Sequence, residues 1–182
     1  MSAPSVLGRS KERFGRVGAA GYGVVLTIVV LAAAGAVGVM AQLPWLFPSL
    51  GPTVMLFFES PEQPASRPLN TIVGHAVGIL AGIACLVAFG LVGQPSAPVG
   101  GLTPGYVMAG ALSVALTTLV LTLIKLPHPP AGASTLIVSL GILTTLSELL
   151  SMIGAVILIT AAGWGLNMLL GTRPAKMKAV AP

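Results

Sequence analysis

The residues best suited to chemistry lie in one short stretch, where Lys125 is followed by His128, Pro129 and Pro130 in an otherwise apolar sequence. Proline fixes φ, lacks an N–H and suits the first turn of a helix. We therefore expect extended backbone through Pro129 and a helix that begins near Pro130. The start of such a helix has free N–H groups and the positive end of a dipole. Inside a membrane this arrangement predicts an anion site that comprises His128, Pro129, Pro130, Ala131, Gly132, Ala133, Ser134 and Thr135.

A second break in the apolar sequence predicts another helix start. Prolines interrupt residues 44–52, and the apolar segment 53–58 follows. As a helix from about Ser49, this segment covers only roughly 15 Å, which is half of a hydrocarbon core of about 30 Å. If the two short helices point their N-termini toward each other, the predicted anion site also includes Ser49, Leu50, Gly51 and Thr53.

Three ionisable residues complete the predicted site. His128 is the sharpest candidate because intramembrane ionisable groups are expected to be functional, and histidine titrates near neutral pH. Its structural alternative is capping of backbone groups at the break. Lys125 either attracts anions or marks the cytoplasmic interface. His75 pairs either with the substrate or with a neighbouring helix.

Composition places the chain in a membrane. Its 182 residues are 55% hydrophobic and only 7% charged, whereas soluble domains carry about 25% charged residues. The apolar runs are continuous rather than alternating, so the spans are helices and not barrel strands. The net charge of +5 gathers at the two ends of the chain. We therefore interpret the basic residues as topology determinants and expect no nucleic-acid partner.

Hydropathy and breaks define the expected organisation. A basic tail (1–16) and a second basic tail (172–182, with Arg173, Lys176 and Lys178) flank one transmembrane domain over 17–171. We expect long spans over 17–43, 70–91, 105–124 and up to residue 170, with Asn70 as an N-cap and a capping box at Thr145 and Glu148. Small residues at Gly74, Gly78 and Gly82 predict close helix packing and also offer a surface for a homodimer.

The two halves of the domain, about 17–92 and 105–171, resemble each other. Laying residues 46–53 beside 127–134 pairs Pro48 with Pro129 and Gly51 with Gly132. The predicted fold is therefore an all-α integral membrane bundle of two inverted three-segment repeats, each with a broken short helix. Six crossings place Arg67 and Lys125 on the same side as both basic termini, in agreement with the positive-inside rule. Four spans with two re-entrant segments is the rival topology.

The run His128-Pro129-Pro130-Ala131-Gly132-Ala133 resembles the signature of the HPP family of integral membrane proteins. Residues 50–58, the Ser60-Pro61 loop and Gly74-His75 resemble the family's other patterned region, so the similarity covers about residues 20–170. The order Arg67-Pro68-Leu69-Asn70 departs from the family's Pro-Arg-Asn order, so no role for that arginine carries over. Characterised members from plastids and cyanobacteria are nitrite transporters, and the resemblance therefore implies a small inorganic anion.

These observations predict a secondary transporter or channel for a small inorganic anion, with nitrite first. We expect a multi-pass protein of the cell inner membrane, with the lipid bilayer as its surroundings and both termini in the cytoplasm. No metal cluster or cofactor motif is evident. Two alternatives stay open: a structural or assembly subunit of a membrane complex, and an intramembrane enzyme that uses His128 as a base but lacks a partner nucleophile.

Overall fold

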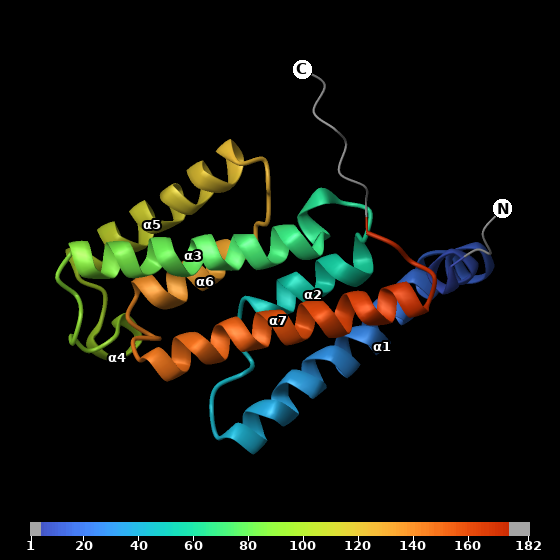
Figure 1. Cartoon of the computed structure of the whole chain (residues 1–182), viewed down its shortest axis with the longest axis horizontal. Coiled ribbons are helices and arrows are strands. Elements are labelled where there is room, and N and C mark those ends of the chain that lie inside the picture. Colours follow the sequence, from blue (N-terminus) through green and yellow to red (C-terminus); the bar gives the residue numbers. More distant parts are fainter. Residues whose placement is uncertain (1–4, 175–182) are drawn as a thin grey trace.

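The computed structural model describes residues 5–174, and these residues form seven α-helices and one 3₁₀-helix with no strand among them. Lys176 and Lys178 of the predicted C-terminal tail lie outside the described residues. Four helices are long and apolar enough to cross a membrane: α1 (Val6–Ala41), α3 (Pro68–Ala88), α5 (Pro104–Leu123) and α7 (Leu146–Leu169). The prediction of an all-helical membrane protein is therefore confirmed (Figure 1).

Two short helices lie among the long ones. They are α2 (Leu50–Glu59) and α6 (Ala131–Ser139), both close to their predicted positions. In Figure 1 the two helices start near the middle of the molecule and run in opposite directions. The chain thus has the order long, short, long twice, as α1–α2–α3 and α5–α6–α7. The remaining elements, η1 (Pro64–Ser66) and α4 (Ala97–Gly100), are single turns within the connecting loops.

The first helix is bent where the sequence predicts a simple basic tail followed by a span. Gly15 has a φ of 58° and a ψ of −133°, a conformation that favours glycine. The hydroxyl of Ser10 donates to the carbonyl of Gly18 across this bend, 3.0 Å away. Residues before the bend are therefore helical, and the Val6 N–H donates to the Leu170 carbonyl at the end of α7.

Gly74, Gly78 and Gly82 form a glycine strip on α3, and α6 and the segment that leads into it pack against this strip. A methyl group on Gly74 would lie 2.7 Å from Cβ of His128, and one on Gly78 would lie 2.7 Å from the carbonyl oxygen of Ala131. Gly82 approaches Val138 in the same way. The prediction of close helix packing at these glycines is confirmed. Because α6 fills the strip, the strip is not free to bind a second copy of the chain.

The other short helix, α2, is fixed between α1 and α7. The Asn167 side-chain amide donates to the Phe57 carbonyl over 2.8 Å, and the Tyr22 hydroxyl donates to the Asn167 carbonyl oxygen over 2.7 Å. The Phe57 ring packs beside Gly163 and Trp164. These contacts hold the short helix in the protein core, where its backbone cannot rely on solvent.

Two predicted helix caps have different outcomes. The capping box at the start of α7 is confirmed, since Thr145 Oγ1 accepts from the Glu148 N–H and Glu148 Oε2 accepts from the Thr145 N–H. The prediction that Asn70 caps α3 is wrong. That helix begins at Pro68 with Arg67 as its N-cap, and the Asn70 side chain instead donates to the Pro127 carbonyl over 3.0 Å.

Candidate functional site

His128 lies in the segment between α5 and α6, and it is 1% exposed. Its ring nitrogen Nδ1 is 2.7 Å from the carbonyl oxygen of Ala65 in η1. A carbonyl oxygen can only accept a hydrogen bond, so this nitrogen carries a proton. The ring fits here because Gly74 has no side chain to displace it. His128 is therefore held by the loop before α3 and by α3 itself.

His75 is the second buried histidine, and it faces His128 from α3. The two Nε2 atoms are 3.2 Å apart, and the ring planes cross at 65° with their centroids 4.9 Å apart. His75 Nε2 also lies 3.0 Å from Thr53 Oγ1 on α2, and Nδ1 lies 2.7 Å from Ser134 Oγ on α6. One imidazole thus bridges the two short helices.

Hydroxyl groups connect the two short helices directly. The Ser134 hydroxyl donates to the hydroxyl oxygen of Ser49, 2.9 Å away, and the Thr53 hydroxyl donates to the Ser49 carbonyl over 2.9 Å. Ser49 immediately precedes α2, and Ser134 lies in the first turn of α6. The N-termini of the two helices therefore meet. We call Ser49, Thr53, His75, His128 and Ser134 the histidine–hydroxyl cluster.

The electrostatic environment of the cluster favours negative charge. The positive ends of two helix dipoles point at it, and its members contribute imidazole and hydroxyl groups but no carboxylate. Within residues 5–174, no three His, Cys, Asp or Glu side chains lie together in a way that could hold a metal ion. The dipole ends and the absence of a carboxylate thus favour a small anion over a cation at the cluster.

The predicted free N–H groups at the start of α6 are not free. The N–H groups of Ala131, Gly132 and Ala133 donate to the carbonyls of the three preceding residues, 128–130, over 3.0 to 3.1 Å. The prolines fold this segment into a tight turn in which each carbonyl accepts a hydrogen bond from the N–H three residues later. The donors that face the centre of the site are therefore side chains rather than backbone N–H groups.

Other predicted site residues lie around the cluster rather than within it. Thr135 faces away, since its hydroxyl contacts Thr117 Oγ1 over 2.9 Å and donates to the Ala131 carbonyl. Leu50 is buried in the apolar core, and the Lys125 side chain is exposed. Gly51 and Pro130 lie at the helix starts, where they shape the turns; Pro129, Gly132 and Ala133 line the cavities described next.

Two cavities flank the proline segment. One of about 320 Å³ lies beside His128 and is lined by Thr117, Thr118, Thr122 and Gly132, among others. Another of about 520 Å³ lies between α2 and the start of α6, with Pro129 and Glu59 among its lining residues. His128 thus borders a space large enough for a small solute.

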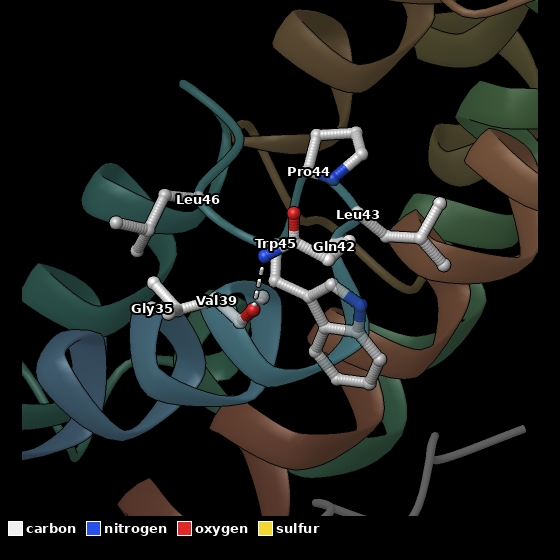
Figure 2. A pocket seen from close by; sticks show the side chains of 8 residues that line it. Gly35, Val39, Gln42, Leu43, Pro44, Trp45 and Leu46 are labelled. Atoms are coloured by element: carbon white, nitrogen blue, oxygen red, sulfur yellow. Dashed lines mark hydrogen bonds between the residues drawn. The ribbon is translucent and has the colours of Figure 1, made fainter.

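A third hollow, of about 350 Å³, is shown in Figure 2, between the end of α1 and the segment that leads to α2. Its walls are mostly apolar, and Gln42 holds its own side chain by donating to the Val39 carbonyl over 2.8 Å. No member of the histidine–hydroxyl cluster lines it. Gln42 is therefore a useful control position for the cluster.

Sequence reasoning missed the groups that fix the histidines from outside. The Ala65 carbonyl gives no signal in a sequence, because any residue type supplies a carbonyl. Asn70 does give a signal, although from the sequence we interpret it as an N-cap. A buried amide on a membrane helix needs a hydrogen-bond partner, and the Asn70 side chain donates to the Pro127 carbonyl. Its Oδ1 atom is buried with no hydrogen-bond partner, so one acceptor stays open next to the turn that holds His128.

The fold and the site define a class of protein: a multi-span helical membrane protein in which two short helices meet at a buried polar centre. The family model described as HPP, transmembrane region, matches residues 9–175, and the chain belongs to this family. A curated transmembrane protein from Dictyostelium discoideum is 28% identical over 102 residues, which are 56% of this chain and 32% of that protein. The chain thus spans about a third of that relative's length. No solved structure matches the chain.

Proposed function

We propose that this protein is a membrane transporter or channel for a small inorganic anion, with nitrite as the first substrate to test. The observation that carries this proposal is the meeting of the two short helices, N-terminus to N-terminus, at a buried pair of histidines. Transporters commonly bind substrate near the membrane midplane, where discontinuous helices point their N-termini at anionic groups.

The contents of the site support an anion over a cation. Two positive dipole ends and the N–H or O–H donors of the cluster would stabilise negative charge. The cluster itself contains no carboxylate to repel an anion. The cavity of about 320 Å³ beside His128 gives a small solute a place from which to reach the pair. The family resemblance makes nitrite the first anion to try.

The proposed topology is that of two inverted repeats. In it α1–α2–α3 and α5–α6–α7 are equivalent halves, and each short helix crosses about half of the membrane. Both ends of the domain would lie on one side of the membrane, which is supported by the hydrogen bond between the Val6 N–H and the Leu170 carbonyl at the end of α7. We propose that this side is the cytoplasm, because the basic residues gather there, and that the membrane is the cell inner membrane.

The test is nitrite flux into proteoliposomes that contain the purified protein. Saturable flux is expected for the native chain and for Gln42→Ala, which removes a polar side chain from the unrelated hollow. Flux should fall at least tenfold in His128→Ala and in His128→Asn, whose amide keeps a donor for the Ala65 carbonyl. Size-exclusion chromatography checks folding of each variant. Equal flux in all four proteins would move the site elsewhere, and no flux of any small anion would favour an assembly role.

A further inference from the structure

The hydrogen bonds around the histidine pair can be followed inward from groups whose direction is fixed. The Ala65 carbonyl only accepts, so His128 Nδ1 carries a proton. A neutral imidazole has one N–H, and His128 Nε2 is then an acceptor that points at His75. On this side of the pair, His128 is satisfied as a neutral ring.

His128 Nε2 fixes the direction on the second side, because it is an acceptor 3.2 Å from His75 Nε2. The Thr53 hydroxyl donates to the Ser49 carbonyl, and its oxygen can accept from His75 Nε2, 3.0 Å away. His75 Nε2 therefore faces two acceptors, Thr53 Oγ1 and His128 Nε2. Both contacts are hydrogen bonds only if His75 Nε2 carries a proton.

On the third side, the Ser134 hydroxyl can take two positions. When it donates to Ser49 Oγ, 2.9 Å away, its oxygen accepts from His75 Nδ1, 2.7 Å away, and that nitrogen also carries a proton. When it donates to His75 Nδ1 instead, the ring is neutral. In the first position the four ring nitrogens hold three protons, which is one more than two neutral imidazoles hold.

We infer that the His75–His128 pair binds one proton more than two neutral rings hold, with His75 protonated at both Nδ1 and Nε2, and that this proton is taken up together with the transported anion. The inference rests on the proposed function. A buried positive charge is costly, and two positive dipole ends raise that cost. An anion in the same site offsets both effects, so proton and anion each favour the binding of the other. A monovalent anion would then move with a proton and without net charge.

The charged residues of the neighbouring elements lie away from the two histidine rings. Among elements packed against the rings, α6 and η1 carry no charged residue. The charges on or beside the others are at element ends: Glu59 ends α2, Arg67 precedes α3 and Lys125 follows α5. On α7, Glu148 binds the Thr145 and Thr144 N–H groups, and the Tyr106 hydroxyl on α5 donates to the Pro95 carbonyl. The hydrogen-bond partners described for the two rings are neutral groups.

Removing the proton has a defined structural consequence. His75 Nδ1 would become an acceptor, and Ser134 would have to turn its hydroxyl proton from Ser49 toward the ring. The bond between Ser49 and Ser134 joins the starts of α2 and α6. Proton release therefore weakens or reverses the one side-chain bond described directly between the two short helices.

The test is ¹⁵N NMR of histidine-labelled protein in lipid nanodiscs, with nitrite as the probe and gluconate at equal ionic strength as the control. The chain has two histidines, and a His75→Gln variant assigns both signals. We expect His128 to stay neutral with its proton on Nδ1. We expect His75 at neutral pH to change from one N–H to two N–H groups when nitrite is added.

A Ser49→Ala variant sharpens the test while keeping both histidines. Ser134 is then free to donate to His75 Nδ1, which satisfies the neutral ring, so nitrite-dependent protonation should fall at least tenfold. Two neutral rings at every pH with nitrite present, in protein that transports nitrite, would overturn the inference and leave the proposed function standing. If His75 becomes protonated when nitrite is added, but the protein shows no nitrite flux, the inference holds as a binding event and transport is refuted.

Discussion

Substitution of Gly78 by alanine tests how α6 is seated on α3. The added methyl would lie 2.7 Å from both the Ala131 carbonyl oxygen and Thr135 Oγ1, whereas ordinary contact begins near 3.4 Å. The two helices must therefore separate locally by about 0.7 Å, the difference between those distances. One of the two obstacles is backbone, which cannot rotate away. Overpacking of this kind destabilises by about 1–3 kcal/mol.

The matched control is Gly165→Ala on α7, where an added methyl meets nothing within 4 Å. Both substitutions gain up to about 1 kcal/mol of helix propensity, so the difference between the two variants isolates the packing effect. Thermal unfolding of the purified protein, followed by the fluorescence of Trp45 and Trp164, should give Gly78→Ala a Tm several degrees below that of Gly165→Ala. Equal Tm values would refute the tight seating of α6.

Three further substitutions give distinct outcomes. Gly74→Ala should push His128 away from the pair and abolish nitrite flux while the protein still elutes as a folded particle; native flux would contradict the site geometry. Asn167→Ala should lower the free energy of unfolding by about 1–3 kcal/mol, because it leaves a buried carbonyl on α2 without a donor; an unchanged Tm would argue against that bond. Thr145→Ala should cost about 1 kcal/mol through loss of the cap at Glu148, and thermal unfolding would measure it.

Local sequence signals predicted the elements well. Runs of apolar residues gave the four long helices, and the prolines at Pro48 and Pro130 gave the two short ones, because proline acts on the backbone next to it. The capping box was predictable for the same reason, since Thr145 and Glu148 are three residues apart. The sequence did not reveal the bend at Gly15, where a hydroxyl eight residues from its acceptor stabilises the kink.

The sequence predicted which residues belong to the site better than it predicted how they are arranged. His75, His128, Ser49, Thr53 and Ser134 were all candidates, because polar residues in apolar runs stand out. Their pairing depends on contacts between distant segments, such as the 3.2 Å approach of the two histidines over 53 residues of chain. The expectation of free N–H groups at the start of α6 was wrong because these groups donate to the carbonyls of residues 128–130 in the preceding turn.

The central claim is that an anion binds where the two short helices meet. The most direct measurement is nitrite binding to the purified protein by isothermal titration calorimetry, in the native chain, in His128→Asn and in Gln42→Ala. We predict saturable binding in the native chain and in Gln42→Ala, and at least tenfold weaker binding in folded His128→Asn. Equal binding in all three proteins would contradict the claim that the histidine–hydroxyl cluster is the anion site.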